Sequence, residues 1–116
     1  MRLSAHFNSK EFTCKCGCGS FIENAELISV LERLRGIFLG KSVHINSGTR
    51  CAVHNKAIGG ASRSQHLLGT AADITIAGVS PKDVAGMLTT MYPTTYGIGR
   101  YNNFTHFDVR EYKARW

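Results

Sequence analysis

The segment Ser64-Gln-His-Leu-Leu-Gly-Thr-Ala-Ala-Asp-Ile-Thr-Ile76 joins a polar loop to a short strand. Its last five residues alternate in polarity, so Asp73 is expected on one face of the strand and the two isoleucines on the other, toward the core. Gly69 and the alanines after it are small and allow backbone to pass closely beneath a site. The segment therefore predicts a strand with an apolar inner face and a carboxylate on the opposite face.

The segment Phe104-Thr-His-Phe-Asp-Val-Arg110 shows the same alternation nearer the end of the chain. Its polar side chains at 106, 108 and 110 share one predicted face, and its apolar ones share the other. Residues 96–101 form another predicted strand, and two asparagines separate it from this one. The two strands are therefore expected to pair as an antiparallel hairpin.

Helical signals surround these strands. Leucines recur at helical spacing after Asn24, a candidate N-cap, and Ser80-Pro81 marks another helix start. The expected elements are a helix from Asn24 to Gly40, a strand over 43–47, a short helix over 50–57 and a helix from Ser80 to about Met91. This order predicts an α+β fold, in which helices flank a small, mainly antiparallel sheet, and a single domain over residues 1–116.

The composition is that of a globular chain, with 43% hydrophobic and 19% charged residues in 116. A net charge of +6 favours anionic partners, but the basic residues form no continuous run, which argues against nucleic acid. No stretch approaches the ~20 apolar residues of a membrane span, and the N-terminus lacks the apolar core of a secretory signal. Synthesis in the cytoplasm is expected.

His66, Asp73 and His106 are the candidate metal ligands. Two imidazoles and one carboxylate are what a catalytic zinc requires, because the fourth position is left for water. A single histidine is more often an ordinary loop or sheet residue than a ligand. The candidate site therefore depends on the three residues acting together.

Three motifs carry a resemblance to the zinc D-alanyl-D-alanine carboxypeptidase family: Ser47-Gly-Thr-Arg50, Ser64-x-His66-x-x-Gly69-x-Ala71-x-Asp73 and His106-x-Asp108. The chain is most similar to the small branch of phage endolysin peptidases and periplasmic murein endopeptidases, over about residues 4–116. This resemblance implies an α+β peptidase fold with Zn²⁺ held by His66, Asp73 and His106. It also implies that Arg50 binds a carboxylate of the substrate, for which a planar guanidinium is suited.

One position departs from the family pattern. Many relatives carry an acidic general base three residues before the last zinc histidine, where this chain has Asn103. Asp108 is the candidate catalytic base by strand geometry, or else a carboxylate that supports His106. Glu111 is a weaker candidate for the base, and His54 is expected to be structural.

The resemblance implies a zinc metallopeptidase that hydrolyses peptide bonds in peptidoglycan, as an endolysin-like endopeptidase. The alternatives are a D-Ala-D-Ala carboxypeptidase or dipeptidase, and a non-catalytic zinc-containing module that binds cell walls. The expected partner is a stem or cross-link peptide, with no nucleic acid and no membrane span, and the protein is expected to be a monomer. Family habit suggests a phage or prophage protein that acts on the wall after release.

Four cysteines, Cys14, Cys16, Cys18 and Cys51, lie outside these motifs. In a cytoplasmic chain they are expected to be reduced thiols. They could hold a structural zinc, although Cys-x-Cys-x-Cys lacks the two-residue spacing of ordinary zinc knuckles. Disulfides formed after release and simple packing are the other two alternatives. A structural role for this segment is expected in each case.

Overall fold

The alternating segments form the centre of a five-stranded sheet. The computed structural model describes residues 1–116, and its strands lie in the order β1-β2-β4-β3-β5. All neighbours pair antiparallel except β3 and β5, which are parallel. The α+β fold with a mainly antiparallel sheet is therefore confirmed. The strand bounds are β1 Val43–Ser47, β2 Ala71–Ile76, β3 Gly97–Arg100, β4 Thr105–Asp108 and β5 Ala114–Arg115.

One face of this sheet carries the apolar side chains. Ile74 lies opposite Ile45 on β1, and Phe107 lies opposite Ala72 and Ile98 on its two neighbours. Ile74 and Phe107 are fully buried. Because directly opposed residues point to the same face, the pattern places the core on one side of the sheet. Asp73, in the next position of β2, then points to the opposite side.

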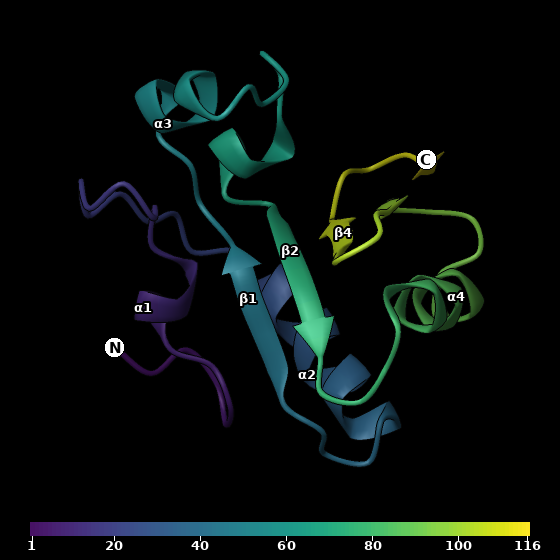
Figure 1. The fold of residues 1–116 in the computed structure, drawn as a ribbon. Helices are drawn as coiled ribbons and strands as arrows, with labels where there is room; N and C mark the ends of the chain where they lie inside the picture. The colour runs from purple at the N-terminus through teal and green to yellow at the C-terminus, as the bar shows by residue number, and fades with distance from the viewer.

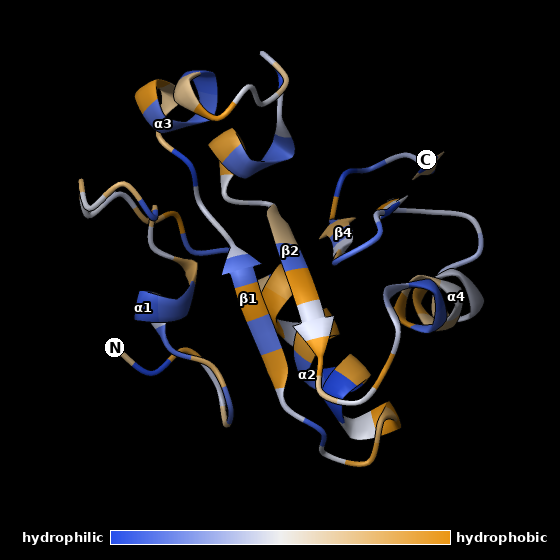
Figure 2. Ribbon diagram, viewed as in Figure 1, coloured by the Kyte–Doolittle hydropathy of each residue, from blue (hydrophilic) through white to orange (hydrophobic).

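Two helices cover the apolar face. α2 (Ala25–Ile37) lies behind β1 and β2, and α4 (Pro81–Met91) lies beside β4 (Figure 1). Their apolar residues alternate with polar ones, as the mixed orange and blue ribbons show (Figure 2). The most deeply buried helical side chains join the sheet in one hydrophobic cluster: Leu27, Leu31, Leu34, Val84 and Leu88.

The predicted helix ends are accurate where a cap fixes them. The Asn24 side chain accepts a hydrogen bond from the Leu27 N–H, and the Ser80 side chain accepts one from the Asp83 N–H. α2 ends at Ile37, however, three residues before the predicted end at Gly40. The chain turns after it through Leu39 and Gly40, both at positive φ. Gly40 therefore lies in the turn rather than next to the last helical residue.

Three short elements were not predicted. They are α1 (Ser9–Phe12), the 3₁₀ helix η1 (Gln65–Leu68) and β5. A helix of one turn has no apolar periodicity from which to detect it. α3 (Ala52–Ala57) starts two residues after its predicted start, because Cys51 is its N-cap. None of the helices is long and apolar enough to cross a membrane.

The predicted hairpin is present with shorter strands. β3 and β4 pair through four registered positions, and residues 101–104 form the turn between them. Glycines on β3 face the polar residues of β4: Gly97 lies opposite Asp108, and Gly99 opposite His106. A Cβ atom at residue 97 would overlap with the Asp108 carboxylate. The absence of a side chain there makes room for a buried charged group.

We expect Gly97→Ala to destabilise the protein by about 1–3 kcal/mol, because an added methyl group displaces the buried Asp108 carboxylate. Gly86→Ala is the matched control. Gly86 is exposed on α4, nothing surrounds its Cβ position, and alanine is the better helix former. Urea unfolding should therefore show opposite shifts of midpoint for the two variants. A Gly97→Ala variant as stable as wild type would contradict this account of the hairpin.

Candidate metal centre

The β2–β4 register places Asp73 directly opposite His106 on the polar face of the sheet. His66 reaches the same point from η1, the short helix that precedes β2 (Figure 1). The Ser64 side chain accepts a hydrogen bond from the His66 N–H, and Gly69 ends this turn in the left-handed conformation. A capped turn and two neighbouring strands thus bring together residues that are 40 positions apart in the chain.

The three predicted ligands meet at one carboxylate oxygen. Asp73 Oδ1 lies 3.1 Å from His66 Nε2 and 3.0 Å from His106 Nδ1. One donor atom from each residue lies within 4.8 Å of the other two. Bonds of about 2.0–2.1 Å at tetrahedral angles would place zinc ligands about 3.3 Å apart. The donor atoms are therefore close to the separation that a zinc ion requires.

The outer nitrogen of each imidazole is held by a different acceptor. His66 Nδ1 lies 2.7 Å from the carbonyl oxygen of Gly48, and His106 Nε2 lies 2.7 Å from Asp108 Oδ2. A carbonyl oxygen only accepts, so His66 Nδ1 carries the proton and its Nε2 presents a lone pair to the site in the neutral ring. Acceptors of this kind commonly orient histidines that ligate metals.

Asp73 is held in its ionised form at the centre of the cluster. Burial opposes ionisation of Asp73, but hydrogen bonds from His106 and His66 outweigh it and lower the pKa of the Asp73 carboxyl to about 2. Burial lowers the pKa of His106, and the carboxylates of Asp108 and Asp73 outweigh it, so this pKa is raised overall. An ionised carboxylate between two nitrogen atoms is stabilised by a proton or by a metal ion. This donor set of two nitrogens and one oxygen fits zinc.

Asp108 is fully buried, and both of its oxygens are occupied. Arg110 donates from Nε to Oδ1 and from Nη2 to Oδ2, each at 2.7 Å, while His106 holds the second oxygen as well. Burial would raise the pKa of the Asp108 carboxyl, but the hydrogen bonds from Arg110 and His106 hold it well below its usual range. The Arg110 backbone N–H also donates to Oδ1, at 3.2 Å, so four hydrogen bonds occupy the lone pairs of the carboxylate. This geometry favours the supporting role over that of a base.

Arg50 lies at the edge of the cluster with 13% of its side chain exposed. Its guanidinium donates to Ser47 Oγ at 3.2 Å, to Asn55 Oδ1 at 3.3 Å and to Asp73 Oδ2 at 3.1 Å. Ser47 reaches this position through an irregularity in β1, where the register shifts so that Ser47 opposes Asp73. These contacts fix the guanidinium beside the candidate metal ligands.

The other acidic and polar candidates lie in the turn between β3 and β4, after β4 and on α3. Asn103 is exposed in the turn between β3 and β4, and Glu111 is exposed after β4. His54 lies half-buried on α3, where its backbone N–H donates to Cys51 Sγ, its carbonyl accepts from the Ile58 N–H, and its ring forms no hydrogen bond. None of these three side chains forms a hydrogen bond with His66, Asp73 or His106.

Trp116 was not predicted as part of the site. Its indole ring lies 5.0 Å from the His106 ring, and the Arg110 guanidinium lies 5.1 Å from the indole. A Cβ atom at Gly99 would overlap with the indole, so Gly99 provides the space that Trp116 fills. In the sequence, the Gly97-x-Gly99 pattern in the strand that pairs with His106-x-Asp108 could have indicated that a large side chain packs there.

A cavity of about 960 Å³ lies beyond this indole. It is lined by α4 and β3, with Lys82, Arg100 and Arg115 as its basic residues, and none of the three predicted ligands lines it. Trp116 lines the cavity and contacts His106, so it connects the two regions. The three basic residues outnumber the single acidic side chain in its lining, that of Asp83, so the cavity favours an anionic ligand.

The comparisons with known proteins give one match. The family model described as Peptidase M15 matches residues 5–108, a range that contains all three predicted ligands, Arg50 and Asp108. No curated protein matches the chain.

Asp108→Asn is expected to weaken zinc affinity about 10- to 100-fold, because His106 loses the charged acceptor that orients it. Competition with a chromophoric chelator measures this affinity. Glu111→Gln is the matched control, since it neutralises an exposed carboxylate three residues further on and should keep wild-type affinity. Wild-type affinity in Asp108→Asn together with lost hydrolysis would assign Asp108 as a proton acceptor instead.

Proposed function

This chain belongs to the peptidase M15 family, and on that premise we propose that it hydrolyses peptide bonds of bacterial peptidoglycan with a zinc ion at His66, Asp73 and His106. The family match identifies a metallopeptidase. The convergence of the three side chains on the polar face of the sheet is the observation that supports the zinc site in this chain.

The chain supplies three zinc ligands. A catalytic zinc keeps its fourth coordination position open for water or substrate. When bound, zinc polarises a peptide carbonyl and makes a water molecule acidic enough to supply hydroxide near neutral pH. His66 and His106 are held as ligands by Gly48 and Asp108, so the site needs little rearrangement. Asp108 is a positioning residue in this proposal, and Arg110 keeps it ionised.

Arg50 is proposed to bind a carboxylate of the substrate. A guanidinium has five N–H groups, and three of them donate to Ser47, Asn55 and Asp73. One N–H therefore remains on each terminal nitrogen. Such a pair matches the two oxygens of a carboxylate and would hold the peptide in a single orientation beside the ligands.

The substrate class is supported by charge. Peptidoglycan stem peptides carry free carboxylates, and the protein has a net charge of +6. Lys82 and Arg100 line the cavity next to Trp116, where they can attract the parts of the peptide that lie away from the scissile bond. Lys82 and Arg100 would therefore favour binding of an anionic peptide over an uncharged one.

The proposed function is tested with His66→Ala. This variant is expected to lose one zinc ion per chain and the release of peptides from purified peptidoglycan together, because a ligand nitrogen is removed. Mass spectrometry of the muropeptides identifies the bond cut in the wild type. Release of a terminal D-alanine alone would indicate a carboxypeptidase, and cleavage within the stem or the cross-link an endopeptidase.

His44→Ala is the matched control for this experiment. His44 is exposed on β1, so its removal should leave zinc content and cleavage unchanged. If His66→Ala cleaves peptidoglycan as well as the wild type does, hydrolysis does not require the proposed metal site. Zinc binding by the wild type without release of any peptide would favour the non-catalytic cell-wall module.

Arg50→Lys is expected to lower kcat/KM about 10- to 100-fold, because hydrogen bonds to charged groups contribute about 1.5–3 kcal/mol and lysine cannot make the paired contact. Zinc content should remain that of the wild type. Arg63→Lys, at an exposed loop position, is the control. A loss of zinc in Arg50→Lys would show that Arg50 acts through Asp73 rather than on the substrate.

A further inference from the structure

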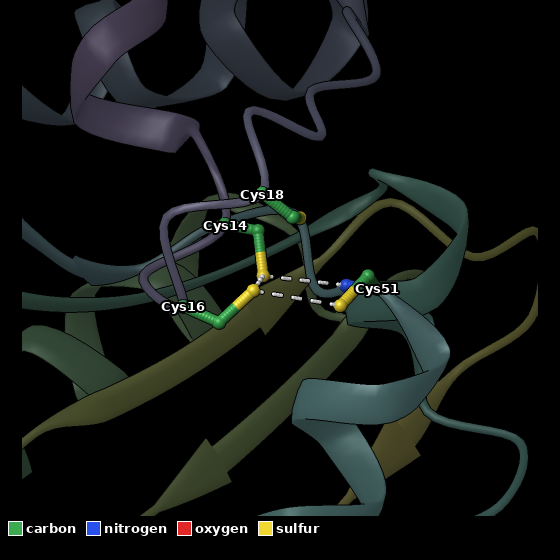
Figure 3. Close-up of side chains that lie close together, drawn as sticks. All are labelled: Cys14, Cys16, Cys18 and Cys51. Carbon is green, nitrogen blue, oxygen red and sulfur yellow. Dashed lines mark hydrogen bonds between the residues drawn. The ribbon is translucent and has the colours of Figure 1, made fainter.

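The four cysteines come together although they lie in two separate segments. Cys14, Cys16 and Cys18 belong to the loop after α1, and Cys51 caps α3 (Figure 3). Their sulfur atoms all lie within 4.8 Å of one another, and no disulfide joins them. We refer to these four residues as the sulfur cluster.

The spacing within the sulfur cluster fits a tetrahedral metal site. Cys16 Sγ lies 3.5 Å from Cys14 Sγ and 3.7 Å from Cys51 Sγ. Zinc–sulfur bonds of about 2.3 Å at tetrahedral angles place thiolates about 3.8 Å apart. A disulfide would instead require about 2.05 Å between one pair of sulfurs, with no need for the other pair to lie nearby. A tetrahedral metal ion requires all four sulfur atoms to lie close to one another, as they do here.

Backbone N–H groups point at two of the sulfurs. The Cys51 N–H donates to Cys14 Sγ at 3.4 Å (Figure 3). The His54 N–H donates to Cys51 Sγ at 3.3 Å. Such donors stabilise a thiolate more than a thiol, because the thiolate carries the full negative charge. Cys14 Sγ and Cys51 Sγ therefore each have a backbone donor that suits a metal-bound thiolate.

The chain between the cysteines bends sharply enough for one-residue spacing. Gly17 and Gly19 adopt positive φ angles of 89° and 81°, which other residues rarely adopt. The Cys14 N–H donates to the Ser20 carbonyl at 2.8 Å and closes the loop on itself. The loop thus turns on both sides of Cys18, and its three cysteine side chains point to the same region. Ordinary two-residue spacing is not required when glycines bend the backbone in this way.

We propose that Cys14, Cys16, Cys18 and Cys51 bind a structural Zn²⁺ ion. Zinc is the divalent ion that most commonly occupies a closed tetrahedral site of thiolates in proteins. All four ligands come from the chain, so no position remains for a substrate. This site is separate from the His66–Asp73–His106 cluster and does not depend on its assignment.

The sulfur cluster clamps the N-terminal segment to the loop that supports the other site. The Thr49 N–H donates to the Phe12 carbonyl at 2.8 Å, and a Cβ atom at Gly48 would overlap with the Phe12 backbone. Gly48 provides the acceptor for His66, and Arg50 directly precedes Cys51 in the chain. Zinc bound by the cysteines would therefore fix the loop from Gly48 to Cys51 from one side.

The test compares metal content and cobalt spectra of three purified, full-length proteins: wild type, His66→Ala and the double variant Cys16→Ser/Cys18→Ser. Both substituted cysteines are exposed, so the double variant should fold. The wild type is expected to bind one more zinc ion per chain than the double variant. After replacement by Co²⁺, a thiolate-to-cobalt charge-transfer band should appear in the wild type and in His66→Ala but not in the double variant.

Four results would overturn this proposal. The first is a wild-type protein, purified under reducing conditions, without the thiolate-to-cobalt band. The second is a protein with iron in place of zinc, which would show a thiolate-to-iron band as isolated. The third is a native protein with no titratable thiols whose mass reports two disulfides before any metal is added. If the band persists in the double variant, another group binds the metal and the assignment of these ligands fails.

Discussion

The meeting of two imidazole nitrogens at one oxygen of Asp73 is the interaction on which the arrangement of the polar face depends. The pairing of β2 with β4 sets it, because Asp73 and His106 are directly opposed and point to the same side. A shift of one residue in that pairing would send His106 into the core and Phe107 to the surface. The hydrophobic packing of Phe107 therefore enforces the position of the polar cluster on the other side of the sheet.

Small residues make room for this arrangement, and charged residues hold it. Gly97 and Gly99 leave space on β3 for the Asp108 carboxylate and the Trp116 indole. Arg110 then binds that carboxylate with two nitrogen atoms and lies against the indole. A buried negative charge is costly unless it is paired, and here the pairing also holds the ring of a candidate ligand.

Much of the fold followed from local patterns. Alternation gave the faces of β2 and β4, and capping residues gave the starts of α2 and α4. Tertiary contacts decided the rest. The register shift at Ser47 has no signal in the sequence, and the choice between the two roles of Asp108 depended on whether Arg110 bends back onto it. Trp116 was missed because five residues separate it from the end of the predicted strand segment that contains its contact, His106. The roles of His66, Asp73, His106 and Arg50 stay predictions.

The ligand candidates lie on β2, β4 and the turn before β2, so an ion bound there would cross-link the middle of the sheet. Only the folded chain brings these atoms together, so occupancy adds directly to the free energy of unfolding. At a free zinc concentration a thousand times the dissociation constant, the gain is about 4 kcal/mol. With such an ion bound, the melting temperature of the protein would depend on the concentration of free zinc, and a chelator in the buffer would lower it.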